Sequence, residues 1–434
     1  MSMPRYPRYK DSGVEWLGEA PEHWAVAPLL GVASERTEPN EGMVEQNLLS
    51  LSYGRIVKKD IDSNDGLLPE SFETYQIVHA GDIVFRLTDL QNDKRSLRTA
   101  IVEERGIITS AYLAVTPTKV DPQFFNHLLR AYDVTKVFYS MGGGLRQSMK
   151  FSDVKRLPIL VPPPTEQIEI AAFLDRETGK IDALVEEQRR LIELLKEKRQ
   201  AVISHAVTKG LDPNAPMKPS GIDWLGDVPS HWELGPIKRF AAVIDCKHHT
   251  VEFIDEGLPV VSIRELEGDK INLENAKLTS RAEWEFLREG RVPCSGDLIL
   301  CRNASVGAVG RVEAGMNFCM GQDVCLIRPR EPDSFFHSVL SSSIIRSQID
   351  ALLVGATIRR LNVEAIRNLD MVLPPKAERL DIAEFLKEES TMIDSLIAEA
   401  TSAIELLQER RSALISAAVT GKIDVRGLAG TEAA

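Results

Sequence analysis

Several basic side chains and one asparagine stand in turn-like segments, where they could contact nucleic acid. Arginine pairs bidentately with the edge of guanine and asparagine with the edge of adenine, while lysine and arginine also bind phosphates. The candidates in the first half are Lys58, Lys59, Arg86, Lys94, Arg95 and Arg98. Those in the second half are Lys247, Arg264, Arg302, Asn303, Arg359 and Arg360. The simpler interpretation of any one of them is a solvated surface cation, although Arg86 and Arg302 both follow a Gly-Asp-Ile/Leu strand, which favours that pair.

The sequence has none of the short motifs that position catalytic or phosphate-binding groups. Gly179-Lys180 and Gly421-Lys422 are each followed by Ile, so neither completes a phosphate loop. There is no G-x-G-x-x-G after a strand, no H-E-x-x-H, no G-x-S-x-G and no [DNS]-P-P-[FYW] tetrapeptide of a base methylase. We therefore expect this chain to contain no catalytic residues.

The cysteines and the paired histidines offer only weak signals for a metal. All five cysteines lie in the second variable segment, at Cys246, Cys294, Cys301, Cys319 and Cys325, and four of them lie in or beside apolar, strand-like runs. No two of them have the C-x-x-C spacing of a zinc site, which favours buried structural cysteines. His248 and His249 could bind metal or phosphate, but an exposed loop is the simpler interpretation. We expect the chain to bind no metal and no cofactor of its own.

The composition is typical of a globular protein with several domains. Of the 434 residues, 43% are hydrophobic and 27% charged, and the formal net charge is −12. That charge argues against non-specific wrapping of nucleic acid, but it says little about a single concave face. The N-terminal segment lacks the apolar stretch of a signal peptide, and five cysteines make no disulfide framework, so we expect a cytoplasmic location.

The chain contains an internal duplication. Tyr9–Leu29 and Met217–Ile237 are identical at ten of 21 positions and share the pattern W-L-G-x-x-P-x-H-W. A second matching pair of segments begins at Leu157 and Leu369, 212 residues apart. Chance is a poor explanation because tryptophan and histidine are rare residues. Two halves of about 215 residues therefore fill the chain.

Two residues of the first repeated pattern are expected to be structural in both copies. We expect His23 and His231 to be hydrogen-bonded, and Trp24 and Trp232 to anchor the packing.

Long helices are expected at about residues 166–208 and 378–420, because both segments lack proline and space their apolar residues by three and four. The predicted seam of the first consists of Ile181, Leu184, Gln188, Leu191, Leu195, Lys198 and Val202. That of the second consists of Ile393, Leu396, Ala400, Ala403, Leu407, Arg410 and Leu414, and the flanking stripes are Val185 with Ile192 and Ile397 with Ile404. Heptads of this kind predict a two-helix coiled coil, antiparallel if a two-fold axis relates the halves. The alternative is that each helix is an ordinary packing element of its own domain.

The remaining segments are rich in strands, since short apolar runs alternate with Gly, Asp and Asn turns. One further helix is expected in each half, at about residues 123–139 and 333–353. Strand–helix alternation is absent, which indicates the α+β class and not a doubly wound sheet. The proline turns Val161–Pro164 and Leu373–Pro375 mark the start of each long helix.

Together these features resemble the specificity (S) subunit of type I restriction–modification systems. The resemblance rests on the doubled architecture, the W-L-G-x-x-P-x-H-W segment, the G-D-I/L strand and the helix start P-P-x-x-E-Q/R-x-x-I-A-x-F-L. It covers essentially the whole chain. The second copy departs from the pattern where Arg379 replaces the glutamine found at Gln167 and Lys376 replaces the proline found at Pro164.

The resemblance implies two strand-rich target-recognition domains joined by an antiparallel two-helix coiled coil, with a pseudo-two-fold internal repeat. Residues 1–157 and 213–369 would be the domains, each reading one half of a bipartite asymmetric site in double-stranded DNA. Residues 158–212 and 370–434 would hold the spacer helices, the second with a tail. About 30 helical residues span about 45 Å, or about 13 base pairs of gap.

The resemblance also implies partners. Two modification (methyltransferase) subunits would dock on the helices, and restriction subunits, which are ATP-dependent translocases and nucleases, would join them in phage defence. The chain itself would be non-catalytic within this restriction endonuclease and adenine-N6 DNA methyltransferase complex. S-adenosylmethionine, ATP and Mg would be bound by the partners.

Two rival classes fit the sequence less well. A self-contained methyltransferase–nuclease fusion needs donor-binding and catalytic motifs, for which two full repeats leave no room. A coiled-coil scaffold without DNA reading does not require two large, divergent, strand-rich segments.

Overall fold

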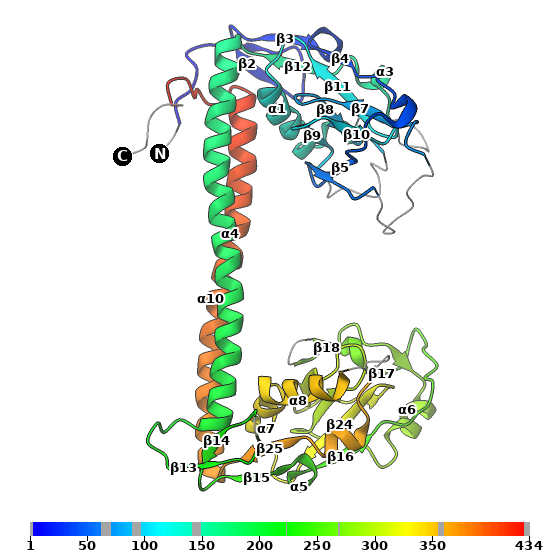
Figure 1. Ribbon diagram of the computed structural model, residues 1–434, viewed down its shortest axis with the longest axis vertical. Helices are drawn as coiled ribbons and strands as arrows, with labels where there is room; N and C mark the ends of the chain where they lie inside the picture. The colour runs from blue at the N-terminus through cyan, green and yellow to red at the C-terminus, as the bar shows by residue number, and fades with distance from the viewer. Residues whose placement is uncertain are drawn as a thin grey trace. The chain divides into compact units, whose positions relative to one another are not determined.

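Two long helices and two strand-rich heads make up the chain in this computed structural model, which describes residues 3–61, 71–88, 97–140, 149–222, 224–267, 270–354 and 360–428. The chain divides into two compact units, unit 1 with residues 1–189 and 402–434 and unit 2 with residues 190–401. Each unit contains one head and one end of both long helices, α4 (Pro164–Lys209) and α10 (Lys376–Val419) (Figure 1). No helix in the described ranges is long and apolar enough to cross a membrane.

The head of unit 1 is built on a four-stranded antiparallel sheet. Its order is β4 (Ala33–Glu35), β11 (Leu113–Pro117), β8 (Ile83–Phe85) and β9 (Thr99–Ile101). Four two-stranded pairs surround it: β1 (Tyr9–Asp11) with β2 (Glu19–Pro21), β3 (Ala25–Pro28) with β12 (Pro158–Val161), β5 (Leu49–Ser52) with β6 (Arg55–Lys58), and β7 (Gln76–Val78) with β10 (Gly106–Ile108). The head's helices are α1 (Pro122–Val134), α2 (Val137–Ser140) and α3 (Phe151–Val154).

The head of unit 2 repeats this plan. Its main sheet has the order β16 (Ala241–Asp245), β24 (Val324–Pro329), β21 (Leu298–Cys301) and β22 (Val309–Arg311). The smaller pairings are β13 (Met217–Pro219) with β14 (Asp227–Pro229), β15 (Glu233–Pro236) with β25 (Asp370–Leu373), β17 (Leu258–Val261) between β20 (Leu278–Thr279) and β23 (Cys319–Met320), and β18 (Leu266–Glu267) with β19 (Lys270–Ile271). Its helices are α5 (Ile237–Phe240), α6 (Arg281–Arg288), α7 (Ser334–Leu340), α8 (Ser343–Leu353) and α9 (Val363–Arg367). In both sheets the fourth strand along the chain lies between the first and the second, so the sequence duplication is a duplication of fold.

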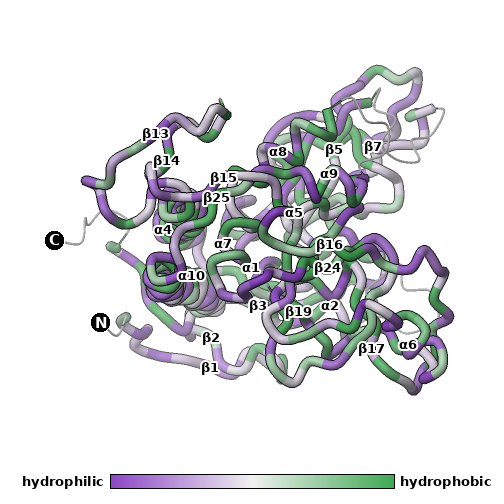
Figure 2. The backbone as a smooth tube through the Cα atoms, turned by 90° about the horizontal axis from the view of Figure 1, so that it is seen from below, coloured by the Kyte–Doolittle hydropathy of each residue, from purple (hydrophilic) through white to green (hydrophobic). Residues whose placement is uncertain are grey.

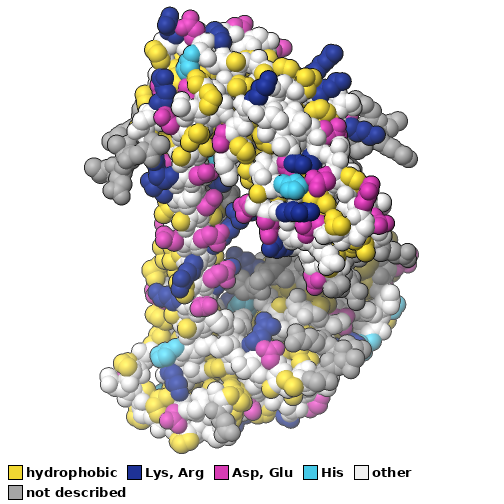
Figure 3. Space-filling view, turned by 45° about the horizontal axis from the view of Figure 1, so that its top comes forward, with side chains coloured by type: hydrophobic (Ala, Val, Ile, Leu, Met, Phe, Trp, Pro, Cys, Tyr) yellow, Lys and Arg dark blue, Asp and Glu magenta, His cyan; other side chains and the backbone are white. Residues whose placement is uncertain are grey.

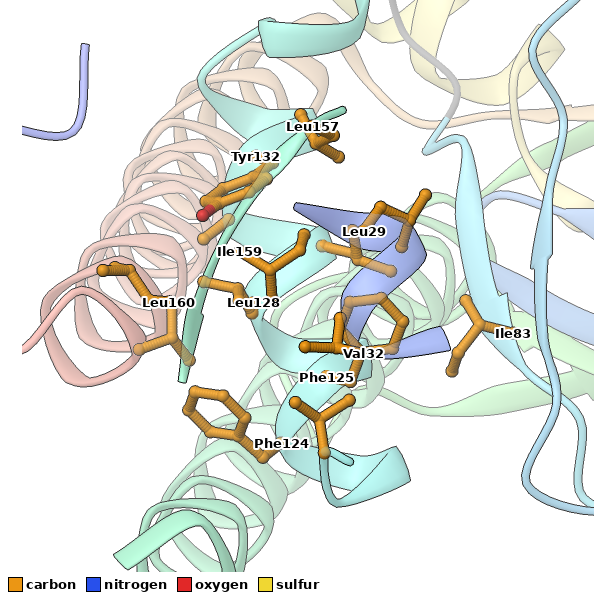
Figure 4. Packing of buried hydrophobic residues seen from close by; sticks show 14 of the residues in the cluster. Leu29, Val32, Ile83, Phe124, Phe125, Leu128, Tyr132, Leu157, Ile159 and Leu160 are labelled. Carbon is orange, nitrogen blue, oxygen red and sulfur yellow. The ribbon is translucent and has the colours of Figure 1, made fainter. Parts of the chain in front are cut away.

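The core of unit 1 forms where α1 packs on the main sheet. Ile83 and Phe85 share a buried cluster with Phe124 and Leu128 of α1, whereas Val84 belongs to a cluster on the other face of the sheet. This division follows from the alternation of side chains along a strand. Figure 4 shows the α1 residues packed together with Leu29 and with residues of β12.

The helix that packs in the core of each head, α1 in unit 1 and α7 in unit 2, begins at an aspartate cap. At the start of α1, Asp121 accepts a hydrogen bond from the amide of Phe124 at 2.9 Å, and Pro122 occupies the first helical position. At the start of α7, 212 residues later, Asp333 accepts one from the amide of Phe335 at 3.1 Å. Such caps satisfy amides that the first helical turn leaves unpaired. The predicted helices at about 123–139 and 333–353 are confirmed, each in two pieces.

Helices α4 and α10 pair antiparallel within each unit. In unit 1 Arg411 Nε of α10 donates to Asp182 of α4 at 2.8 Å, and in unit 2 Arg199 of α4 donates to Asp394 of α10. The two aspartates are 212 residues apart, as are the two arginines, so the repeated residues form the same ion pair in both units. The antiparallel two-helix coiled coil is thereby confirmed. Both helices carry hydrophilic and hydrophobic residues in Figure 2, as amphipathic helices do.

The buried stripe of each long helix differs from the predicted coiled-coil seam. At every second seam position, the residue that follows the predicted one is the buried one. Ile181, Leu195 and Ile393 are buried, and Val202, Leu407 and Leu414 are half-buried. Leu184, Leu191 and Leu396 are instead 45%, 42% and 42% exposed, so their placement on the seam was wrong. The buried stripe continues through the flanking residues, with Val185 buried and Ile192, Ile397 and Ile404 half-buried. Both lines have three–four spacing, and only the packing of the helices distinguishes them.

Candidate nucleic-acid interface

In unit 1 the repeated tryptophan–histidine segment packs against the start of α4. Glu166, in the first turn of α4 and 4% exposed, accepts hydrogen bonds from Trp24 Nε1 at 2.9 Å and from His23 Nε2 at 2.8 Å. It also accepts one from the hydroxyl of Tyr6. Burial and the nearby carboxylate raise the pKa of Tyr6, so its hydroxyl stays protonated and remains a donor.

The same contact recurs in unit 2. Glu378 of α10 accepts hydrogen bonds from Trp232 Nε1 at 3.0 Å and from His231 Nε2 at 2.8 Å. We call each set of tryptophan, histidine and glutamate a clamp. The prediction that both histidines are hydrogen-bonded and both tryptophans anchor the packing is confirmed, since both indoles are almost wholly buried.

Each clamp also touches the end of the other long helix. Gly421 follows α10 with φ of 72°, and a Cβ there would lie 2.3 Å from the ring of Pro21 and 3.3 Å from Trp24. Gly210 follows α4 with φ of 75°, and a Cβ there would lie 3.1 Å from Glu378 and 3.2 Å from Trp232. Glycine is the residue that tolerates both the left-handed backbone and this close approach. Each clamp therefore holds the beginning of one helix and the end of the other.

The departure from the repeat at Arg379 is accommodated locally. Gln167 Nε2 donates at 2.8 Å to a proline carbonyl before α4, and Gln167 Oε1 accepts from the amide of Asp121 at 2.7 Å. Arg379 donates at 3.2 Å to the proline carbonyl before α10 and at 2.8 Å to the carboxylate of Asp333. Both side chains thus tie the start of a long helix to the aspartate cap of α1 or α7, the amide through the backbone of Asp121 and the guanidinium through the carboxylate of Asp333.

In unit 1 the candidate cations lie in different environments. Lys58, at the end of β6, and Lys59 are both exposed, and Lys58 forms an ion pair with Glu104 at 2.9 Å. Arg86 follows β8 directly and is half-buried. A role of these three in DNA contact stays a prediction. Lys94 and Arg95 lie outside the described residues.

Arg98 does not fit a surface role. Its side chain is fully buried, and it donates to the carbonyl of Thr88 at 3.0 Å and to the hydroxyl of Tyr139 at 3.3 Å. A guanidinium enclosed in this way has no access to a base edge. The structure therefore corrects the assignment of Arg98. Its side chain ties the segment after β8, at Thr88, to the start of β9.

In unit 2 several candidates gather around Asp323, in the turn between β23 and β24. The carboxylate of Asp323 accepts hydrogen bonds from Arg360 Nη2 at 3.1 Å and Asn303 Nδ2 at 3.3 Å, and its carbonyl accepts one from the amide of Arg302 at 2.8 Å. Arg264 lies beside Asp323 on the wall of one cavity. Arg359 lies outside the part of the chain that the structure describes.

The prediction that pairs Arg302 with Arg86 is also corrected. Arg302 is 4% exposed, donates to the carbonyl of Leu361 at 3.0 Å and forms an ion pair with Asp245. In the two main sheets Ile83 corresponds to Leu298, so the counterpart of Arg86 is Cys301 and not Arg302. A shift of one residue along a strand turns a side chain to the opposite face.

Lys247 and His249 hold a loop against α6, whereas His248 pairs with Asp245 at 3.2 Å. Lys247 Nζ lies 2.9 Å from Glu289 and 3.5 Å from the ring centroid of Phe286, and this hydrogen bond lowers the pKa of Glu289. His249 pairs with Glu283 at 2.8 Å. Because Lys247 is only 17% exposed, it is less available to DNA than the sequence indicates.

The described part of the chain provides hydrogen-bond donors and cations but no metal centre. No group of three His, Cys, Asp or Glu residues able to hold a metal occurs in the described ranges. Cys246, Cys301, Cys319 and Cys325 are buried, and burial raises the pKa of their thiols, that of Cys319 to about 12. Such thiols stay protonated and are poor nucleophiles. Figure 3 shows Lys and Arg side chains interspersed with Asp and Glu on the face in view.

Two kinds of candidate residue were not assigned from the sequence. Gln322 and Lys277 line the same cavity as Arg264, and no local pattern distinguishes them from other surface residues. The carboxylates that complete the clamps, by contrast, stand in both copies of the repeated P-P-x-x-E motif. Comparison of the two halves was the signal that could have identified them.

Comparisons with known proteins agree with this duplicated architecture. No family model matches the chain. It is 24% identical over 431 residues to the MjaX specificity subunit of a type I restriction enzyme from Methanocaldococcus jannaschii, and the match covers 94% of this chain and 96% of the relative. It is 23% identical over 286 residues to the type I restriction enzyme MjaVIII specificity subunit of the same organism, covering 63% of this chain and 64% of that protein.

The fold also has a solved counterpart. A chain from a structure of the type I R-M system, determined to explain complex assembly and conformational transition, matches with a TM-score of 0.63 at 17% identity. The match covers 92% of this chain and 98% of the other. In sequence and in fold, along nearly its whole length, this chain is similar to specificity subunits of type I restriction enzymes.

Proposed function

We propose that the chain is the DNA-recognition subunit of a type I restriction–modification complex, and that each head reads one half of a bipartite asymmetric site. One observation carries this proposal: both heads keep the same sheet order and the same clamp, while their loops differ. The turn at Asp323 gathers arginine and asparagine side chains in unit 2, whereas unit 1 has a β5–β6 hairpin whose last residue is Lys58. A shared sheet and clamp that carry different loops suit two domains that recognise different DNA sequences.

The long helices would serve as the spacer and as the docking surface. Several apolar side chains along them are 42–63% exposed, namely Leu184, Leu191, Leu194, Met392, Leu396 and Leu406. Apolar residues left exposed along a helix are typical of a surface that a partner covers. We infer that two modification (methyltransferase) subunits dock there and that restriction subunits join them.

The chemistry would come from these partners, in the cytoplasm. They would bind S-adenosylmethionine, ATP and Mg, methylate adenine at N6 and cleave unmodified DNA, as defence against phage. The buried, protonated thiols of unit 2 are in keeping with a chain that recognises and does not react.

Co-expression with the cognate modification subunits tests the proposal. Sequencing that detects N6-methyladenine in a methylation-deficient host should show one bipartite motif with an unread gap. Inserting one heptad into both helices lengthens each by about 10 Å and should widen that gap by about three base pairs. A single uninterrupted motif, or methylation by the purified chain alone, would contradict the proposal.

A further inference from the structure

A cavity of about 280 Å³ lies in the head of unit 2 beside Asp323. Phe253 and Lys277 form one side, with Lys277 Nζ 4.2 Å from the ring centroid of Phe253. Arg264, from the turn after β17, and Gln322, from the turn between β23 and β24, also line it. A concave site with an aromatic wall and a few convergent polar groups is typical of a binding site.

Close backbone packing brings the two turns together. The amide of Gly321 donates to the carbonyl of Val261 at 2.8 Å, and a Cβ on Gly321 would lie 2.1 Å from Ser262 Oγ. A side chain at this position would have to displace the Ser262 hydroxyl, so glycine suits the close approach that sets Gln322 beside the turn that carries Arg264. Asp323 follows with φ of 66°, a left-handed conformation that is uncommon for residues other than glycine and is found often at functional sites.

The polar side chains of the cavity differ in what they already bind. The carboxylate of Asp323 is occupied by Asn303 and Arg360, which it holds in place. Arg264 and Gln322 are exposed, and within the described ranges neither side chain forms a hydrogen bond or an ion pair. Their donors and acceptors are therefore free for a ligand. Arg264 and Lys277 line the cavity, and Arg360 lies beside it on Asp323, so three cations stand near two carboxylates, those of Asp323 and Glu265. Glu265 is buried and already accepts a hydrogen bond from the amide of Ser262, so the exposed charge at this rim is mainly positive, which suits an anionic polymer.

We propose that this rim is the base-reading site of the second head, with Arg264 contacting a guanine and Gln322 an adenine in the major groove. Both side chains can form bidentate pairs, arginine with O6 and N7 of guanine and glutamine with N6 and N7 of adenine. Phe253 offers the apolar contact that suits the methyl group of a thymine. The inference rests on the proposed function, and it adds which residues determine the second half-site.

The test uses the full chain assembled with its modification subunits. Arg264→Ala and Gln322→Ala should each lower affinity for the cognate site by about 5- to 150-fold and remove discrimination at one position of the second half-site. Discrimination at the first half-site should not change. Arg281→Ala is the matched control, because Arg281 is an 84% exposed arginine of the same head that pairs with Glu285 outside the cavity. Arg264→Lys keeps the charge but not the planar fork, and it should lose discrimination as the alanine variant does.

Gel shifts with duplexes substituted one base at a time separate the outcomes. Uniformly weaker binding to all sequences, with a salt slope smaller by about one, would make Arg264 a phosphate contact and overturn the proposal. Unchanged discrimination in both alanine variants would overturn it as well. A wild-type complex that binds no bipartite site would defeat the proposed function itself, which is a different result. Thermal unfolding of each variant shows that the head is intact.

Discussion

The clamps predict an unequal response when their glutamates are truncated. Glu166 is buried and accepts from Trp24 and Tyr6, whose donors lose their partner in Glu166→Ala. A buried donor left unpaired costs about 1–3 kcal/mol, so two cost about 2–6 kcal/mol. The Glu378 side chain is 28% exposed and that of His231 46%, so Glu378→Ala leaves only Trp232 unpaired in the interior and should cost about 1–3 kcal/mol.

Urea unfolding followed by tryptophan fluorescence measures the difference, because both clamp indoles report on their own unit. Glu166→Gln is the informative companion variant. Both Trp24 and Tyr6 donate to Oε1, which an amide retains, so this variant should lose less than about 1 kcal/mol. Glu187→Ala, an exposed substitution on α4, controls for the loss of one helix carboxylate.

The ranking is what tests the reasoning. Glu166→Ala should be the most destabilising, Glu378→Ala intermediate and Glu166→Gln the mildest. Equal losses in both alanine variants, or a glutamine variant as unstable as Glu166→Ala, would refute the idea that unpaired indole and hydroxyl donors set the cost.

Three further perturbations follow from the structure. Burial raises the pKa of Asp133 to about 6, above its ordinary value of about 3.9. The protonated carboxyl therefore stabilises the fold below about pH 4, and up to about 3 kcal/mol of the free energy of unfolding is lost as the pH rises through 6. Asp133→Asn should abolish that dependence, and an unchanged pH profile of unfolding in the variant would contradict the prediction. Leu195→Asp should destabilise the coiled coil because Leu195 is buried, whereas Leu191→Asp should leave the helices folded and weaken assembly with modification subunits because Leu191 is exposed. Circular dichroism measures the folding and size-exclusion chromatography the assembly, and identical behaviour of the two variants would count against the corrected seam. Reversing the charge of either Asp182 or Arg411 should lower the free energy of unfolding by about 1 kcal/mol, and reversing both charges should restore most of it. A double variant no more stable than either single variant would argue against pairing across the helices.

Much of the fold could be predicted from the sequence because the duplication constrains it. The matching Ile-Asp motifs predict equivalent helices, and the structure pairs both aspartates with equivalent arginines. The exact seam could not be predicted, because Leu184 and Val185 both continue a three–four pattern from Ile181. Which of them is buried depends on how the partner helix packs, and that is not a local property of the sequence.

The candidate interface was less predictable for a related reason. Arg98 and Arg302 stand in turn-like sequence, which indicates exposure, but distant residues bury both. Arg302 meets Asp245, 57 residues away, and Arg98 meets Tyr139, 41 residues away. Conversely, Gln322 has no local signature and gains its position from the contact between Gly321 and Ser262.

The central claim is that the two heads recognise DNA independently of each other, while the duplicated clamps and long helices hold them. An exchange of one head tests this claim most directly. Residues 30–150 are replaced by the corresponding segment of a type I specificity subunit with a different target, and the host methylome is sequenced after co-expression with the modification subunits. We expect a new sequence in one half-site, with the other half-site and the gap unchanged. Altered bases in both half-sites would contradict it.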